Sequence, residues 1–259
     1  ANGKDGASKL IRNLYIPPTF VQADGKSFGE MVKSELVTYG DEWKDANLDD
    51  GQNGLYNAKQ AKEEFAKAKS ALEADGVKFP IHLDMPVDQT TQSKVQRAQS
   101  FKQSVEETLG TENVVVDLQM MDQDEVLNIT LNVPSAAETD WDLQGLVGWN
   151  PDYDDPSTYL DTLQPSSPDQ TKTYLGFAGG VDNASAKAVG LDEFAKLLDD
   201  AEKEPQDVVT RYDKFAAAQA WLTDSALVIP TMTSSGAGTV VSKVVPFSGP
   251  SSQTGNKGS

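Results

Sequence analysis

Two successive helix-then-strand patterns occupy residues 57–121 of this 259-residue sequence. In the first, Asn57 is a good N-cap and is followed three residues later by Gln60, as in a capping box. Apolar residues then recur every three or four positions up to Leu72, and Gly76 can end the helix in a left-handed conformation. Residues 91–109 repeat the pattern with a second apolar stripe. Each helix leads through a short link into a strand.

The strands predict how the chain is layered. Over residues 77–85 apolar and polar side chains alternate, which predicts a strand with one buried face, and Pro80 places it at a sheet edge or a strand end. Residues 113–121 predict a second strand and residues 141–149 a third. Helix–strand–helix–strand order with short links indicates an α/β fold, with a mixed sheet flanked by helices.

The second half of the chain is predicted to be mainly helical. The expected elements are a short helix near 157–163, a helix around Leu191, Phe194 and Leu198, a longer helix over 205–225, and strands at 226–230 and 239–245. Residues 248–259 have the polar composition of a linker. We find no internal repeat of 20–50 residues, which excludes a solenoid.

Composition removes several classes of chemistry. The absence of cysteine excludes disulfide scaffolds, thiolate metal sites and cysteine nucleophiles, and the single histidine, His82, excludes a multi-histidine metal site. The formal net charge of −18 makes nucleic acid an unfavourable partner. No apolar run is long enough to span a membrane. These features favour a binding protein without a cofactor over an enzyme.

Motifs for nucleotide, metal or acid–base chemistry are incomplete. Gly25-Lys26-Ser27 lacks the leading glycine of a phosphate-binding loop, and no nucleophile elbow occurs. Asp152, Asp154 and Asp155 resemble a calcium loop, but Ser157 and Leu163 stand where an EF-hand needs glycine and glutamate. His82 next to Asp84 could be a general base, although a surface histidine on a half-exposed strand is the favoured interpretation.

The loop over residues 148–156 (GWNPDYDDP) stands out. A strand delivers Trp149 and then breaks into an acidic loop bounded by prolines. Such a loop can present an indole face and a carboxylate to a ligand while the scaffold holds both still. In the alternative interpretation the aspartates cap the helix that follows. Asp155 is expected to do so, whereas Asp152 is too far from the helix start.

Four stretches together resemble one protein family. They are Leu55-Tyr56-Asn57-Ala58, residues 95–122, residues 148–159 and residues 211–230, in the same order and at similar spacing. The sequence is similar in these stretches to the extracellular oligopeptide-binding proteins of ABC importers (solute-binding protein family 5), specifically the Ami/Ali-type lipoproteins of streptococci. The resemblance covers nearly the whole chain.

The resemblance implies a domain organisation. Members of the family are two-lobed clamshells that enclose a peptide and run to roughly twice the length of this chain, as expected for chains of two to three domains. This chain would then be mainly the second lobe, a type II periplasmic-binding-protein-like lobe corresponding to domain III. The implied boundaries are a hinge segment at 1–20, the peptide-binding lobe at 21–225, return strands toward the other lobe at 226–247, and a polar tail at 248–259.

The resemblance also assigns roles to the loop. Asp152 matches the aspartate that receives the α-ammonium group of the peptide, and Trp149 matches a tryptophan that lines a side-chain pocket. Gly148 and Asn150 would offer backbone groups to an extended peptide, and Tyr153 lies in the same loop. No catalytic residue, metal site or cofactor is implied.

The resemblance also implies partners. The implied partners are oligopeptides and, through a full-length protein lipid-anchored on the outer surface of the cell membrane, the permease subunits of an ABC transporter. Unpaired strand edges predict a possible edge-strand dimer of this chain. Two alternatives remain open, namely a surface adhesion or interaction module and an acidic-dyad hydrolase.

Overall fold

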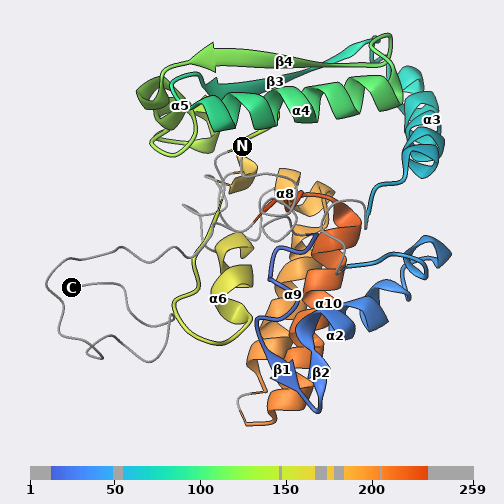
Figure 1. Cartoon of the computed structure of the whole chain (residues 1–259), viewed down its shortest axis with the longest axis vertical. Helices are drawn as coiled ribbons and strands as arrows, with labels where there is room; N and C mark the ends of the chain where they lie inside the picture. The colour runs from blue at the N-terminus through green and yellow to red at the C-terminus, as the bar shows by residue number, and fades with distance from the viewer. Residues whose placement is uncertain are drawn as a thin grey trace, which may run out of the picture. The chain divides into compact units, whose positions relative to one another are not determined.

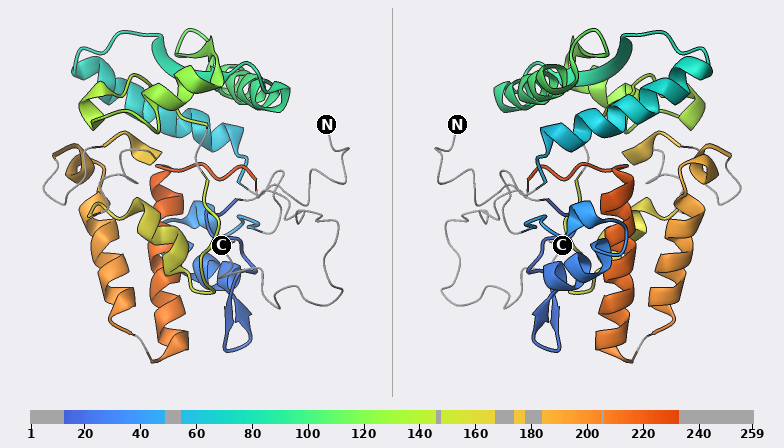
Figure 2. Two further views of the ribbon diagram at one scale, coloured as in Figure 1. Left: turned by 90° about the vertical axis from the view of Figure 1, so that its left-hand side faces the viewer. Right: turned by 90° about the vertical axis from the view of Figure 1, so that its right-hand side faces the viewer.

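The computed structural model describes residues 13–48, 55–145, 148–166, 174–177, 184–204 and 206–232. The chain divides into two compact units, each with its own helices and strands (Figure 1 and Figure 2). Unit 1 contains residues 56–148 and 172–178, and unit 2 contains residues 2–55, 149–171 and 179–259.

The first predicted helix of unit 1 is confirmed as α3 (Ala58–Ala74). The side chain of Asn57 accepts a hydrogen bond from the Gln60 amide at 3.0 Å, and Gly76 has the expected left-handed conformation with φ of +84°. The amide of Val77 donates to the Leu72 carbonyl at 2.9 Å, which completes the helix end. No residue of α3 is fully buried, so its apolar stripe is only partly covered.

The first predicted strand is confirmed as β3 (Ile81–Asp88), shifted toward the C-terminus. It begins directly after Pro80, as expected because proline has no amide to give to a ladder. Residues 77–80 lie outside the strand, since the amide of Val77 is used by the end of α3. The predicted start of this strand at residue 77 is therefore wrong, and β3 begins at Ile81.

The second helix–strand pair is confirmed as α4 (Gln92–Leu109) and β4 (Val114–Met121). The strands β3 and β4 pair in parallel, from Ile81 opposite Val114 to Asp88 opposite Met121. A parallel pair needs a crossover connection, and α4 supplies it by running along the strands (Figure 1). Residues 81–121 therefore form a β–α–β unit, followed by α5 (Gln123–Ile129).

A buried carboxylate joins the end of β3 to the start of α4. The side chain of Asp88 accepts hydrogen bonds from the Thr90 amide (2.9 Å) and the Thr91 hydroxyl (2.9 Å), and forms an ion pair with Lys94 (2.8 Å). The Lys94 ammonium, together with the threonine donors, holds the pKa of Asp88 well below its usual range. Its charge is thus fully compensated.

The third predicted strand is wrong in its described residues, 141–145 and 148–149, which have no strand assignment. Instead, the amides of Asp142 and Leu143 both donate to the Asp84 carbonyl at 3.0 Å. The Asp84 amide in turn donates to the Asp142 carboxylate at 2.8 Å. The acceptor for the Asp84 amide is thus a side-chain oxygen and not a backbone carbonyl. The segment around Asp142 therefore lies against the edge of β3 without forming a ladder.

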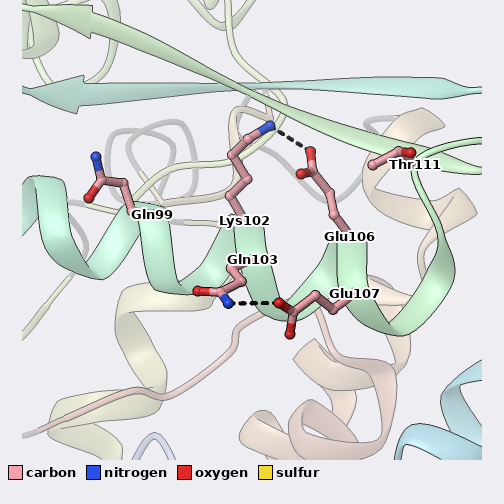
Figure 3. A pocket seen from close by; sticks show the side chains of 6 residues that line it. All are labelled: Gln99, Lys102, Gln103, Glu106, Glu107 and Thr111. Atoms are coloured by element: carbon pink, nitrogen blue, oxygen red, sulfur yellow. Dashed lines mark hydrogen bonds and ion pairs between the residues drawn. The ribbon is translucent and has the colours of Figure 1, made fainter.

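The outer edge of β4 is covered at its centre by two side chains of α4. Lys102 Nζ donates to the Val116 carbonyl at 2.6 Å, and the Val116 amide donates to the Glu106 carboxylate at 3.0 Å. Lys102 and Glu106 also pair with each other at 2.6 Å (Figure 3). Strand addition at Val116 would have to break these bonds. The edge-strand dimer stays a prediction, and this edge is a poor place for it.

Unit 2 is held together by three helices, α2 (Phe28–Leu36), α9 (Leu191–Glu202) and α10 (Val208–Ser225). Helix α10 packs against both α2 and α9 (Figure 2). The largest fully buried side chains of unit 2 are Phe28, Phe194, Phe215, Leu14, Ile16, Leu36, Leu160, Leu163, Leu191, Leu198, Leu222 and Gln219. The short antiparallel pair β1 (Gln22–Ala23) and β2 (Lys26–Ser27) precedes α2.

The described part of the predicted hinge segment packs into this core. Leu14 is 1% exposed and Ile16 is fully buried. The ring of Tyr15 lies edge-on to Tyr159, with 5.9 Å between ring centroids. The domain boundaries inferred from the sequence stay a prediction, because packing within unit 2 says nothing about a second lobe.

The helices predicted for the second half of the chain are confirmed. The short helix forms as α6 (Ser157–Leu160) and the 3₁₀ turn η3 (Asp161–Leu163), and α9 lies where its apolar residues predict. The long helix begins at Val208, because the Asp207 side chain accepts hydrogen bonds from the Val209 and Thr210 amides. Shorter elements are η1 (Asp41–Trp43), η2 (Ala136–Glu138) and α8 (Ala184–Ala188).

The strand predicted at 226–230 is wrong in this structure. Helix α10 ends at Ala226 in a left-handed conformation with φ of +53°, and turns and bends follow. Apolar residues alone do not make a strand; they need a neighbouring strand, and the described residues provide none here. The strand predicted at 239–245 and the tail at 248–259 lie outside the described residues.

Candidate binding loop

The acidic loop predicted from the sequence directly precedes α6. Gly148 belongs to unit 1, and residues 149–156 belong to unit 2. Within unit 2, Trp149 and Asp152 are half-buried, while Asn150 and Tyr153 are exposed. The predicted contact residues of unit 2 therefore include two that are partly shielded from water and two that are open to it.

Asp155 caps the short helix, as predicted. Its Oδ1 atom accepts a hydrogen bond from the Ser157 amide at 3.1 Å. Helix α6 is only one turn long, and Ser157 is its first residue, whose amide has no acceptor within the helix itself. The alternative interpretation of the loop, in which its aspartates cap the helix, therefore holds for Asp155.

Asp152 is anchored differently. Its amide donates to the Thr158 hydroxyl at 2.9 Å, across the turn that leads into α6. The Tyr153 hydroxyl lies 3.2 Å from the Ser157 hydroxyl. The backbone of Asp152 and the side chain of Tyr153 thus both contact the first residues of α6. The amides of Ser157, Thr158 and Tyr159 bond to Asp155 and Pro156, so Asp152 does not share the capping role of Asp155.

Gly148 and Asn150 are the two residues predicted to offer backbone groups to a peptide. Both residues are exposed. The Gly148 carbonyl accepts a hydrogen bond from the Tyr174 hydroxyl at 2.9 Å, a contact that the sequence did not predict. Because a carbonyl oxygen has two lone pairs, it can accept a second bond. No signal in the sequence marks Tyr174.

The sequence analysis also missed Arg211 as a partner of the loop. Its Nε and one terminal nitrogen each donate to an oxygen of Asp155 at 2.9 Å, a paired geometry that only arginine can provide. Burial by itself would raise the pKa of Asp155, but the hydrogen bonds from Arg211 and Ser157 outweigh it and lower that pKa. Arg211 opens the fourth stretch of the family resemblance, and that position was the available signal.

Asp161, at the end of α6, is a carboxyl group in an unfavourable environment. Burial raises its pKa to about 6, and the negative charges of Glu202 and Asp155 add to the shift, while Arg211 opposes it. At neutral pH the group is ionised at a cost. Its folded pKa lies above the 3.8 of an unperturbed aspartate, so its contribution to stability is lost as pH rises from about 4 to about 6.

Replacing Asp161 with Asn is therefore expected to stabilise the protein near neutral pH by about 1 kcal/mol, a figure reduced for solvent screening. Near pH 4 the two proteins should have the same stability, because Asp161 is then protonated in the folded state. Urea unfolding at both pH values measures the effect, with Asp213→Asn on the exposed side of α10 as the control. Equal stabilisation at both pH values would contradict the prediction.

The other candidate chemistry receives no support from the structure. His82 contacts Asp117 at 2.7 Å rather than Asp84, and its side chain is 60% exposed, as for a surface histidine. Within the described ranges no group of three or more Asp, Glu or His side chains is placed to hold a metal ion. The hollow in Figure 3 has a volume of about 380 Å³ and is lined by polar side chains of α4 and by Thr111. Within this lining Lys102 bonds to Glu106 and to β4, and Gln103 bonds to Glu107.

None of the helices in the described part of the chain combines the length and apolar character needed to cross a membrane.

The fold resembles that of solved peptide-transport proteins. A peptide-binding protein of a peptide ABC transporter matches with a TM-score of 0.59 and 21% identity, over 87% of this chain and 81% of that one. The substrate-binding domain of an oligopeptide ABC transporter from Bacillus anthracis matches with a TM-score of 0.60 and 21% identity, over 89% of this chain and 36% of that one. These matches support the predicted α/β, periplasmic-binding-protein-like fold.

Sequence comparison gives much closer relatives. The chain is 63% identical over 257 residues to the oligopeptide-binding protein AliA of Streptococcus pneumoniae, covering 99% of this chain and 39% of AliA. It is 62% identical to SarA of Streptococcus gordonii and 60% identical to AmiA of Streptococcus pneumoniae, again over 38–39% of their length. No family model matches the chain. The resemblance drawn from the sequence is confirmed: the chain is a close homologue of part of the streptococcal Ami, Ali and Sar oligopeptide-binding proteins and spans about two fifths of their length.

Proposed function

We propose that the chain acts as part of the substrate-binding component of an ATP-driven oligopeptide importer. The carrying observation is the 63% identity with the oligopeptide-binding protein AliA over 99% of this chain. The likeness to peptide-transport structures supports the fold on which such binding depends. The relatives are all named as binding proteins, which supports a role in capture without catalysis.

The proposed contact with the peptide is its N-terminus. Asp152 would receive the α-ammonium group, because a half-buried carboxylate facing an ammonium forms a charge-assisted hydrogen bond worth about 1.5–3 kcal/mol. Trp149, also half-buried, would line a side-chain pocket, and the exposed Tyr153 lies beside Asp152 in the sequence.

Backbone groups at Gly148 and Asn150 would pair with an extended peptide. Both residues are exposed, which favours access of a peptide to their backbone groups. Backbone pairing reads every peptide alike, in the manner of strand addition, and loose sequence specificity follows. Peptides of different sequence should therefore compete for one site.

The proposed biological setting follows from the family. A protein of the relatives' length would lie outside the cell, anchored by lipid, and would close around a peptide through hinge motion before docking on membrane permeases. The chain spans 39% of the length of AliA. Because it then supplies only part of the contact surface, its own peptide affinity should be weak, on the order of millimolar.

The ammonium contact can be tested by NMR titration of the isotope-labelled chain with two forms of one short peptide, free and N-acetylated. We expect the free peptide to shift the amides of residues 149–153 and the Trp149 indole signal. The Asp152→Ala variant should bind the free peptide about tenfold more weakly or worse, because the charge-assisted bond is lost. The acetylated peptide should bind both proteins equally weakly.

The matched control is Asp154→Ala, which removes the same charge from an exposed position two residues along the loop. Its effect on affinity should be within about twofold, since exposed charges contribute little. Equal losses for the free and acetylated peptides in Asp152→Ala would reject the ammonium assignment. Titration calorimetry that showed tight peptide binding by this chain alone would reject the expected weak affinity.

A further inference from the structure

The guanidinium group of Arg211 joins three elements of unit 2. It reaches from α10 to Asp155 with two hydrogen bonds of 2.9 Å, and its remaining terminal nitrogen donates to the Ala201 carbonyl at 3.2 Å in the last turn of α9. Both side chains of the pair are largely buried, at 17% and 21% exposure. The aromatic ring of Phe215 in α10 supports the group as well, since the guanidinium carbon lies 4.7 Å from the centre of that ring.

We propose that Arg211 is a positioning residue for the binding loop, which it holds through Asp155 so that Asp152 and Tyr153 keep their places. The inference deepens the proposed function and rests on it for the identity of the ligand. The positioning itself is a property of the loop and can be measured without any peptide.

Local hydrogen bonds carry the constraint from Asp155 to the contact residues. The Asp155 amide donates to the Tyr153 carbonyl at 3.0 Å, and the Asp155 carboxylate accepts from the Ser157 amide. The next residue of α6, Thr158, receives the amide of Asp152 at 2.9 Å. Asp155 thus connects to both sides of the turn that contains Asp152, and Arg211 connects Asp155 to the helical core.

The neighbouring Tyr212 adds a weaker contact of the same kind. Its hydroxyl lies 3.5 Å from the Asp154 carbonyl, at the long limit for a hydrogen bond. Two successive residues of α10 therefore reach the same loop. Arg211 makes the stronger contacts, because its bonds are shorter, charge-assisted and paired.

The charges around Asp155 make Arg211 hard to replace. Asp161 and Glu202 are close enough for their negative charges to influence this cluster, and Arg211 is the cation that opposes them. A lysine would keep one positive charge but could not donate in parallel to both oxygens of Asp155 while also reaching Ala201. Arg211→Lys is therefore the discriminating variant, because it preserves net charge and removes the paired geometry.

The first measurement is hydrogen exchange of the whole 259-residue chain without ligand, followed by mass spectrometry. In Arg211→Lys, amides of residues 150–158 should exchange about tenfold faster or more, while the segments of α2 remain protected. Asp155→Asn, which keeps one acceptor oxygen, replaces the other by an amide group that cannot accept from Arg211, and removes the charge, should give a smaller change in the same residues. The matched control is Lys214→Ala, which breaks a similar ion pair to Glu204 (2.8 Å) one turn further along α10. It should leave exchange in the loop unchanged.

The second measurement is the NMR titration with free and acetylated peptide. In Arg211→Lys the free peptide should bind about fivefold to tenfold more weakly, while the weak binding of the acetylated form changes less. Faster loop exchange combined with no peptide binding by the unmodified chain would leave the positioning role supported and reject the proposed function. Unchanged loop exchange in both Arg211→Lys and Asp155→Asn would overturn the inference. A uniform loss of protection, including α2, would overturn it as well, since Arg211 would then support general stability.

Discussion

Replacing Phe194 with Ala is expected to lower the free energy of unfolding of the protein by about 3–5 kcal/mol. Phe194 is fully buried in α9, and its ring lies 5.4 Å from the ring of Trp221 in α10. The substitution removes the apolar surface that joins the two helices and leaves a cavity that the surrounding side chains can fill only in part. Urea unfolding followed by far-UV circular dichroism measures the loss.

The conservative variant Phe194→Leu is the control. It keeps most of the buried volume and should cost less than about 1.5 kcal/mol. A loss of less than about 1 kcal/mol in Phe194→Ala would show that the contact between α9 and α10 does not depend on this ring. The signal of Trp221, which packs against Phe194, should report the change in its environment by fluorescence.

Replacing Gln219 with Glu is expected to destabilise the protein by about 3 kcal/mol or more near neutral pH. Gln219 is fully buried in α10; its Oε1 atom accepts from the Ile16 amide at 3.0 Å, and its amide nitrogen donates to the Thr223 hydroxyl at 3.1 Å. A glutamate of the same shape would keep the acceptor for Ile16 but would bury a negative charge, and the two described partners of this side chain, the Ile16 amide and the Thr223 hydroxyl, carry no positive charge.

The stability lost in Gln219→Glu should depend on pH. Burial should raise the pKa of the new glutamate above its unfolded value, so the variant regains stability as pH falls through the folded pKa. Gln219→Leu is the control: it leaves the Ile16 amide without an acceptor and should cost about 1–3 kcal/mol at every pH. A penalty in Gln219→Glu that persists in acid would contradict the account. Urea unfolding at about pH 4 and about pH 7 distinguishes the two variants.

The helices were the most predictable part of the fold. Helix α3 is defined by residues close together in sequence, from the cap at Asn57 to the left-handed Gly76, so a local pattern suffices. The β–α–β unit was predictable for the same reason, since its two strands are joined by one helix of the right length. The strands predicted at 141–149 and 226–230 were wrong in their described residues, because a strand exists only if a partner lies beside it.

In the binding loop, too, local features were predictable from the sequence and long-range contacts were not. The sequence indicated the loop, the capping role of Asp155 and the different position of Asp152, since all three depend on neighbours within about six residues, as in local capping motifs. It did not indicate Arg211, which lies 56 residues from Asp155, or Tyr174, whose hydroxyl reaches the Gly148 carbonyl across 26 residues. Nothing in a local pattern specifies which arginine meets which aspartate.

Local sequence therefore determined where most helices and the parallel strand pair lie, as well as which loop is chemically distinctive and, through resemblance, the family. Only the tertiary structure decided what anchors that loop, how the edges of β3 and β4 are covered, and that Gln219 receives the amide of Ile16 across 203 residues. The physical reason is the distance along the sequence over which each kind of interaction acts. Caps, turns and apolar periodicity act between near neighbours, whereas the ion pair of Arg211 and the hydrogen bond of Gln219 exist only after packing has brought distant residues together.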